Sequence, residues 1–299
     1  MRGMAARIVV VGVVAMSWIA TTPRRPAAAA ETVTPTLIQT IDTSQLSPPI
    51  PDPSGLAFLP SGNLLVADAE VDEIPSLYKG KNVFEVTTAG ELVDSFRTTR
   101  FSTEPAGLAV IDGRVGVSDD DGDRVFLVGP GPDRRYGTKD DRVRSFSTSP
   151  FGSNDPEGLA YGGGAFFIAD GKGAEVYRVT RGPNAVFDGV PPIGDDTVSH
   201  FDTAELGQPD PEGIEFNADT GTLFIVSNAK DSNIIETTIQ GRLLTTIDLS
   251  AIGVHSPAGL AFGPGSADPR ISSLYIADRG RDNSTDPSEN DGRIFEISF

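Results

Sequence analysis

The chain has 299 residues, with 42 acidic against 24 basic side chains, a formal net charge of −18 and no cysteine. This excess of acidic residues disfavours nucleic acid and anionic lipid as partners, because both carry charge of the same sign. The absence of cysteine excludes disulfide bonds and a lipid anchor on cysteine, so calcium ions bound by acidic side chains are the expected substitute cross-links.

Residues 1–30 have the pattern of a secretory signal peptide. Two arginines precede an apolar segment at 8–20, and a run of four alanines ends at Ala30. Because the apolar segment is shorter than the ~20 residues that span a bilayer, it indicates a leader and no membrane anchor. We expect cleavage near Ala30, or alternatively at Ala20, and a secreted protein, extracellular or periplasmic. The leader holds four arginines and no acid, so the mature chain, 31–299, has 20 basic and 42 acidic residues, a formal charge of −22, and is expected to form a single domain.

A proline–x–glycine unit followed by two apolar runs recurs five times after the leader. In its clearest copy, 155–170, the sequence is DPEGLAYGGGAFFIAD. The repeated prolines are separated by 52, 51, 55 and 46 residues and are Pro53, Pro105, Pro156, Pro211 and Pro257. A period near 50 residues, built from short apolar runs and turns rich in glycine, proline and aspartate, is typical of the blade of a β-propeller.

Further runs in each unit predict the outer strands of a blade. The third runs alternate with period two, as half-buried strands do, and are 82–86, 124–128, 175–179, 233–237 and 293–297. A fourth run follows in four units but not in the fifth, which ends at Phe299. The segment 36–42, TLIQTID, has the pattern of the fourth run LLTTID at 243–248. We therefore predict an all-β, five-bladed propeller with four-stranded blades, the last blade being closed by the N-terminal strand.

The glycine of each repeat is predicted to serve packing. These glycines are Gly55, Gly107, Gly158, Gly213 and Gly259. They open the innermost strands, where the blades converge and where a side chain would meet a neighbouring strand. The apolar residues that follow each glycine should fill the space between neighbouring blades.

The proline–x–glycine motif and the second motif, FFIAD at 166–170 with its copies, give the chain a resemblance to a broad family. It resembles the calcium-associated propellers that include NHL-repeat, gluconolactonase-like, SdiA-regulated and phytase-like proteins, over nearly all of 36–299. This resemblance implies a ligand or metal site at the mouth of the central channel, formed by loops into the first strands and out of the second strands. Family members with lactonase or phosphoesterase activity hold calcium there, whereas NHL proteins often have no catalytic activity.

Two rings of side chains are expected at this mouth. The first ring precedes the repeated glycines and consists of Ser54, Ala106, Glu157, Glu212 and Ala258. The second ring ends the second strands and consists of Asp68, Asp119, Asp170, Asn228 and Asp278. Oxygen ligands of this kind suit calcium, so the acidic members of both rings are candidate metal ligands, and the neutral Ser54 and Asn228 are candidate ligand-binding residues. The alternative is that each aspartate caps its own turn by accepting a backbone N–H.

Two further residues are candidates for catalysis. Glu215 stands where the other repeats have alanine, and a carboxylate on an inner strand is costly unless it is paired or bound to a metal. It is therefore expected to be a site residue or, alternatively, an ion-pair partner for a neighbouring blade. His255, two residues before Pro257, is expected to border the mouth as a general base or to be an ordinary loop histidine, while His200 is expected to face solvent.

Four acidic loops form a separate set of candidate calcium sites. They are 118–123, 131–141, 187–196 and 278–292, and the first of them, SDDDGD, contributes Asp121 and Asp123 as candidate ligands. None has the spacing of the helix–loop–helix calcium motif. They are expected to be irregular calcium loops or, alternatively, solvated turns.

Two classes of function follow from these features. In the first, a calcium-dependent hydrolase opens a lactone, ester or phosphoester at the channel mouth, with the cation polarising the oxygen under attack. In the second, the propeller binds a small molecule or an extracellular protein without catalysis, and its calcium is structural. The sequence leaves open whether the protein is an enzyme, and it does not indicate an oligomeric state.

Overall fold

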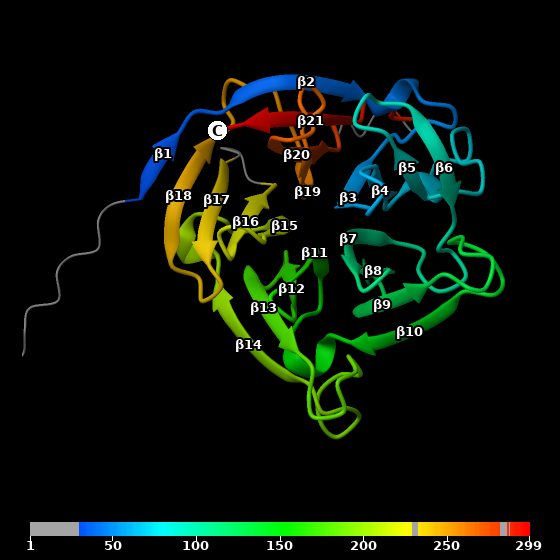
Figure 1. Ribbon diagram of the computed structural model, residues 1–299, viewed down its shortest axis with the longest axis vertical. Coiled ribbons are helices and arrows are strands. Elements are labelled where there is room, and N and C mark those ends of the chain that lie inside the picture. The colour runs from blue at the N-terminus through cyan, green and yellow to red at the C-terminus, as the bar shows by residue number, and fades with distance from the viewer. Residues whose placement is uncertain (1–29, 229–232, 282–285, 287) are drawn as a thin grey trace, which may run out of the picture.

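The computed structural model describes residues 30–228, 233–281, 286 and 288–299. The predicted signal peptide lies, except for Ala30, outside these described residues. Five sheets, each with four antiparallel strands, are arranged as blades in a ring around a common axis, and one of them carries an additional parallel strand at its edge (Figure 1). The predicted five-bladed, all-β propeller with four-stranded blades is thereby confirmed.

Each blade runs from an inner strand near the axis to an outer strand at the rim. Blade one contains β3 (Pro53–Phe58), β4 (Leu64–Asp68), β5 (Val83–Val86) and β6 (Leu92–Phe96), and blade two contains β7 (Pro105–Ile111), β8 (Arg114–Asp119), β9 (Arg124–Gly129) and β10 (Arg142–Ser147). Blade three contains β11 (Pro156–Gly162), β12 (Ala165–Asp170), β13 (Glu175–Thr180) and β14 (Thr197–Asp202). Blade four contains β15 (Pro211–Asn217), β16 (Thr222–Ser227), β17 (Asn233–Thr238) and β18 (Leu243–Asp248), and blade five contains β19 (Pro257–Pro264), β20 (Ser272–Asp278), β21 (Arg293–Ser298) and β2 (Thr36–Asp42). Short 3-10 turns lie in the connections, at η1 (Thr43–Gln45), η2 (Val71–Glu73), η3 (Ser149–Phe151) and η4 (Ala204–Leu206).

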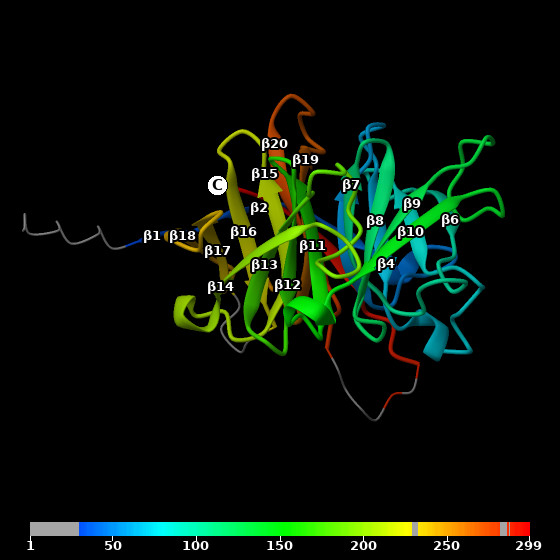
Figure 2. The same ribbon diagram turned by 90° about the horizontal axis from the view of Figure 1, so that it is seen from below.

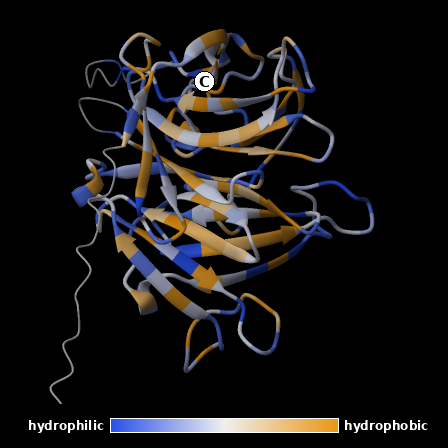
Figure 3. Cartoon of the chain, turned by 60° about the vertical axis from the view of Figure 1, so that its left-hand side comes forward, coloured by the Kyte–Doolittle hydropathy of each residue, from blue (hydrophilic) through white to orange (hydrophobic). Residues whose placement is uncertain are grey.

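The core consists of five apolar layers, one between each pair of neighbouring blades. Second strands such as β4 and β12 are buried on both faces, which explains why their sequences are continuously apolar. In outer strands such as β14 the side chains are exposed or half-buried, because only one face of the strand meets a neighbouring blade. Most of the apolar residues accordingly lie in the strands and most of the hydrophilic ones in the loops (Figure 3).

The repeated glycines pack as predicted, in a closed ring of backbone contacts. A Cβ on Gly55 would meet the carbonyl of Ala106, and one on Gly107 would meet that of Glu157. The same contact continues around the ring from Gly158 to Glu212, from Gly213 to Ala258 and from Gly259 to Ser54. The innermost strands therefore approach one another at main-chain distance, which only glycine permits.

The N-terminal strand closes blade five as predicted. β2 pairs antiparallel with β21, from Asp42 opposite Arg293 to Thr36 opposite Ser298. A second N-terminal strand, β1 (Glu31–Val33), pairs parallel with β18 of blade four and was not predicted, because three residues give no periodic signal. The N-terminal segment thus lies along the rim of two neighbouring blades (Figure 1). No helix in the described part of the chain is long and apolar enough to cross a membrane.

Candidate metal and ligand site at the channel mouth

The loops that enter the first strands and leave the second strands meet at one end of the ring, which we call the mouth. Antiparallel pairing brings them together, since in each blade the proline that opens the first strand lies opposite the last residue of the second. Figure 2 shows the blades from the side, with connecting loops projecting at both ends. The mouth is the end at which the residues before the repeated prolines gather; they are Asp52, Glu104, Asp155, Asp210 and Ser256.

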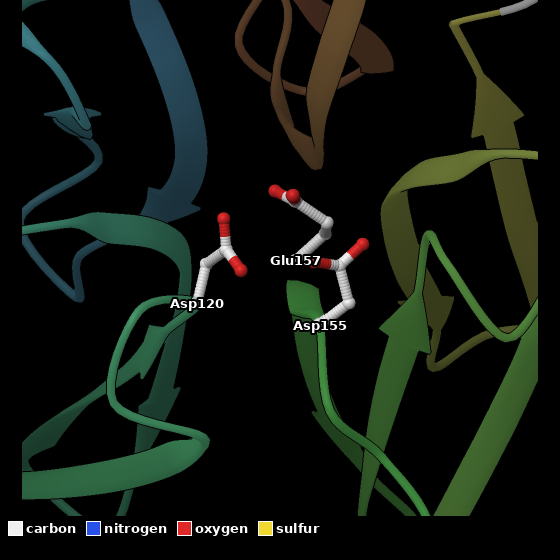
Figure 4. Close-up of side chains that lie close together, drawn as sticks. All are labelled: Asp120, Asp155 and Glu157. Carbon is white, nitrogen blue, oxygen red and sulfur yellow. The ribbon is translucent and has the colours of Figure 1, made fainter.

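Three carboxylates at the mouth form what we call the acidic cluster. Asp120 follows the second strand of blade two, while Asp155 and Glu157 flank Pro156 at the start of β11. One oxygen from each of the three side chains lies within 4.8 Å of the others. Figure 4 shows the three carboxylates converging from two neighbouring blades. Asp120 is distant from the other two residues in the sequence, and the three meet because blades two and three approach each other at the axis.

Arg279 lies beside the acidic cluster and joins four blades. It directly follows β20 of blade five, and its guanidinium lies 3.1 Å from Glu212 and 3.6 Å from Glu157. Its Nε lies 3.9 Å from the carboxylate of Asp52. Burial acts to lower the pKa of Arg279, but the combined attraction of these carboxylates raises it above the ordinary value. Arg279 is therefore a permanently charged group in a largely carboxylate environment.

The carboxyl groups of the mouth have raised pKa values. Burial, opposed by Arg279 and reinforced by nearby acids, raises the pKa of Asp52 to about 7. Burial and the neighbouring Asp155 raise the pKa of Asp120 to about 7, and burial with repulsion from Asp120 raises that of Glu104 to about 8. Burial and the charge of Glu212 also raise the pKa of Glu157. The acids are thus too close to be fully ionised near neutral pH unless additional positive charge joins them.

The acidic cluster has the ligand type and spacing that calcium requires. Calcium binds carboxylate oxygens at about 2.3–2.6 Å, so two ligands on opposite sides of one ion are up to about 5 Å apart. The oxygens of Asp120, Asp155 and Glu157 meet this limit, since they lie within 4.8 Å of one another. A set of hard oxygen donors with no histidine or cysteine favours calcium over a transition metal.

A cavity of about 300 Å³ lies at the mouth beside Arg279. Its other polar lining residues include Asp52, Glu70, Asn228 and Ser256. Because Arg279 contacts Glu157 of the acidic cluster and also lines this cavity, a molecule bound in the cavity would lie next to the cluster. The mouth therefore combines a candidate cation site with space for a small ligand.

Four members of the predicted second ring cap turns, the alternative that the sequence left open. Asp68 accepts the N–H groups of Asp52 and Val71 at 2.9 and 2.8 Å, and Asp278 accepts those of His255 and Ser256 at 2.9 and 2.7 Å. Asp119 and Asp170 accept N–H groups three residues further on, at Gly122 and Gly173. All four are buried against their own loops and lie outside the acidic cluster. Of the predicted metal ligands, the structure brings only Glu157 into that cluster.

The neutral members of the predicted rings have different positions. The expectation that Asn228 continues the aspartate ring is wrong, because Ser227 lies opposite Pro211. The hydroxyl of Ser227 accepts the Asp210 N–H at 3.0 Å, as the aspartates of the other blades accept N–H groups of their loops. Asn228 is exposed and lines the cavity at the mouth. Ser54 is buried and donates to the Pro105 carbonyl at 3.1 Å, which ties blade one to blade two.

Glu215 does not share the mouth with Glu157 and Glu212, contrary to the expectation. A strand rises about 3.3 Å per residue, which puts Glu215 about 10 Å along β15 from Glu212. Its carboxylate accepts the Phe262 N–H at 3.2 Å and lines a separate cavity near the chain end with Phe299. Burial raises the pKa of Glu215 to about 8. The carboxylate therefore joins blade four to blade five through a main-chain hydrogen bond.

The two histidines occupy the regions that the sequence predicted. His255 lies in the loop before β19, with its Nδ1 3.9 Å from Asp278 Oδ2 and its side chain 31% exposed. It is next to Ser256, which lines the cavity at the mouth. His200 is exposed on β14, stacks on Tyr177 and lies 3.0 Å from Glu175.

The acidic loops differ in what their side chains do. Asp121 is exposed, and Asp123 has a positive φ of 48° and accepts the Thr148 N–H through its main-chain carbonyl. In the loop at 187–196, oxygens of Asp188, Asp195 and Asp196 lie within 4.8 Å of one another. Asp188 and Asp196 also accept backbone N–H groups of that loop, and Asp195 accepts the N–H of Asn184. This loop is a second place where the described residues fit a cation. Part of the predicted loop at 278–292 lies outside the described residues.

The sequence analysis missed the residues that build the centre of the site. Asp52, Asp155 and Asp210 directly precede the repeated prolines, and Asp120 and Arg279 directly follow the second strands. Their positions within the repeat are the signal that could have identified them. Arg279 in particular occupies a position where blades two, three and four have Asp120, Gly171 and Asn228.

Comparisons with known proteins support the fold. No family model and no curated protein matches the chain. Among solved structures, glutaminyl cyclase from Myxococcus xanthus is similar at 14% identity and a TM-score of 0.54, covering 90% of this chain and 97% of that one. A luciferin-regenerating enzyme is similar at 13% identity and a TM-score of 0.51, covering 89% and 95%. These neighbours are β-propeller proteins, so the likeness establishes the fold class of this chain.

Proposed function

We propose that this protein is a secreted β-propeller that binds calcium at the acidic cluster and hydrolyses a lactone, ester or phosphoester in the adjoining cavity. The observation that carries the proposal is the convergence of Asp120, Asp155 and Glu157 within 4.8 Å, beside a cavity lined by Arg279. The acidic surface and the lack of cysteine agree with an extracytoplasmic protein that uses calcium.

The side chains around the cavity suit hydrolysis by water. Asp120, Asp155 and Glu157 would hold the calcium ion, which supplies Lewis acidity toward the substrate oxygen when bound. Arg279 presents positive charge to the cavity, where it can stabilise an oxyanion or a phosphate group. Asp52, with a pKa of about 7, can accept a proton from the attacking water and deliver it to the leaving oxygen. One bond from water oxygen to carbon or phosphorus forms while the bond to the leaving group breaks.

A second candidate is a binding module with structural calcium. It is favoured by the ion pairs of Arg279, whose guanidinium already contacts Glu157 and Glu212 and is partly neutralised. In that case the cavity would hold a small molecule or a side chain of an extracellular protein without reaction.

Variants of the acidic cluster test the proposal. Asp155→Asn and Glu157→Gln each remove a charge with little change of shape, and each is expected to weaken calcium binding by about 10-fold or more. Activity found in a screen of lactones, aryl esters and phosphoesters should fall by about 100-fold or more in both variants. Calcium titration by calorimetry and initial-rate measurements provide the two readouts.

Glu215→Gln is the matched control, because this half-buried carboxylate lies about 10 Å along the strand from Glu212. It should leave calcium affinity and activity unchanged. Equal calcium binding by the parent and both cluster variants would overturn the proposed site. Calcium binding that depends on the cluster, with no activity on any substrate class, would favour the binding module.

Calcium is expected to raise the melting temperature, and more so at pH 8 than at pH 5.5. Carboxyl groups with raised folded-state pKa values bind more protons in the folded than in the unfolded protein between about pH 4 and 8. The stability that they contribute is therefore complete below their unfolded pKa and is lost as pH rises through 7–8. At calcium concentrations 100-fold above Kd, binding adds about 2.7 kcal/mol, or roughly 5–10 °C.

The measurement is a thermal melt with millimolar calcium or chelator at both pH values. The Asp155→Asn variant is the control, since it should show a smaller calcium effect and a flatter pH dependence. Superimposable curves with calcium and chelator at pH 8 would contradict a calcium site anywhere in the folded protein.

A further inference from the structure

Four arginines line one cavity at the opposite end of blades two and three from the mouth. The cavity has a volume of about 200 Å³ and is lined by Arg114, Arg142, Arg144 and Arg181 together with apolar residues. β7 starts at the mouth beside Glu104 and ends at Ile111 in this cavity, so the cavity and the mouth lie at opposite ends of the strand. In a chain with 24 basic and 42 acidic residues, such a local concentration of arginine is unexpected by composition.

The positive charge of this arginine cavity is only partly neutralised. Half-buried Arg181 lies 3.1 Å from the exposed Asp112. In the part of the chain that the structure describes, the ion pairs within 4.0 Å include none for Arg114, Arg142 or Arg144. Guanidinium groups that share a small cavity repel one another, and an anion between them would relieve this repulsion.

The floor of the arginine cavity is apolar and firmly packed. Phe187 is 3% exposed and belongs to the apolar layer between blades two and three, with its ring 4.6 Å from that of Phe166. The guanidinium of Arg181 lies over the Phe187 ring at 4.6 Å. Leu127 and Ile111 complete this floor. The cavity therefore offers an apolar surface with cationic groups above it.

We propose that the arginine cavity binds a small organic anion. The apolar body of the ligand would lie against Phe187 and Leu127, and its carboxylate or phosphate would pair with Arg142 and Arg144, since guanidinium matches both groups in a bidentate geometry. A volume of about 200 Å³ is below the roughly 300–1,000 Å³ of sites for drug-sized molecules, which favours a ligand with a single ring. The acidic remainder of the surface disfavours nucleic acid and other polyanions.

The experiment measures binding of four probes to the protein in chelator, so that the mouth is free of metal. Phenyl phosphate and benzoate are expected to bind. Phenol, which lacks the anionic group, and inorganic phosphate, which lacks the aromatic ring, are expected to bind at least 10-fold more weakly. Preference between phenyl phosphate and benzoate identifies the anionic group. Affinity should fall with added salt, as it does for ion pairs at an accessible site.

The double variant Arg142→Gln, Arg144→Gln should lower the affinity for the preferred probe at least 10-fold. Both side chains are exposed, so the double variant is expected to keep the fold. The variant Ala185→Glu adds a carboxylate to the lining of the cavity and is expected to lower the affinity as well. Arg242→Gln is the matched control, since Arg242 precedes β18 in the corresponding hairpin of blade four. Failure of both aromatic anions to bind, equal binding of phenol, or unchanged affinity in the double variant would each overturn the proposal.

Discussion

Deletion of residues 31–43 is expected to destabilise the protein by at least about 5 kcal/mol and to cause aggregation. The deletion removes β2, its ladder of main-chain hydrogen bonds with β21, and the buried Ile41, which packs in the layer between blades five and one. Each such hydrogen bond contributes about 0.5–1.5 kcal/mol and burial of one isoleucine about 1.5–3 kcal/mol. The free edge of β21 would also be open to pairing with another chain. Urea unfolding and size-exclusion chromatography measure both effects.

A shorter deletion of residues 31–34 is the control for this experiment. It removes β1, whose three residues are exposed or half-buried, and leaves β2 in place. Its cost is expected to be within about 1 kcal/mol, as for most surface changes. A monomeric 31–43 deletion with the stability of the parent would show that β2 does not hold the ring closed.

Arg279→Gln is expected to cost about 3–5 kcal/mol at pH 7 in chelator. The change leaves the nearby carboxylates of Glu157, Glu212 and Asp52 without their counter-charge, and loss of one partner from a buried ion pair has a cost of this size. At pH 5 the loss should be smaller, because the raised pKa values of these carboxyl groups allow them to become protonated. Urea unfolding at the two pH values measures the difference.

Arg270→Gln provides the comparison within the same blade. Arg270 forms an exposed pair with Asp268 at 2.7 Å, and an exposed pair of this kind contributes at most about 1 kcal/mol. Calcium should recover part of the stability lost in Arg279→Gln, since a cation bound at the proposed site would supply positive charge beside Glu157. Equal stability of the two variants at pH 7 would mean that Arg279 does not balance the charge of the mouth.

The sequence determined the fold because the patterns that mark each strand are local and recur in every repeat. Alternation with period two marks the outer strands, and continuous apolar runs mark the second strands, which are buried on both faces. The repeat of proline, glycine and strand gave the number of blades, and the pattern of Thr36–Asp42 identified the strand that completes the ring. The glycines could be interpreted as packing residues because their reason is steric and recurs in every blade.

Two site assignments made from the sequence failed, for different reasons. In blade four Ser227, and not Asn228, lies opposite Pro211, because LFIVS at 223–227 is the copy of FFIAD at 166–170. The one-residue register shift after Pro211 is not special to this blade, since it follows the repeated proline in every blade. Glu215 departed from the repeat as a site residue would, yet its carboxylate bonds to the backbone of blade five. A one-residue offset in the alignment of a repeat assigns a strand side chain to the wrong face, whereas the hydrogen bond that Glu215 makes across the blade boundary cannot be derived from the repeat at all.

Fold class, blade number, ring closure and the acidic character of the surface were therefore set by the sequence itself. The tertiary structure decided which acids meet, by bringing Asp120 and Asp155 together from separate blades and by placing Arg279 of blade five against Glu157 and Glu212. It also decided that four of the predicted aspartates cap turns. The reason is physical: strand formation depends on neighbours along the chain, whereas a site at the axis depends on distances between blades that are set by packing of the whole ring.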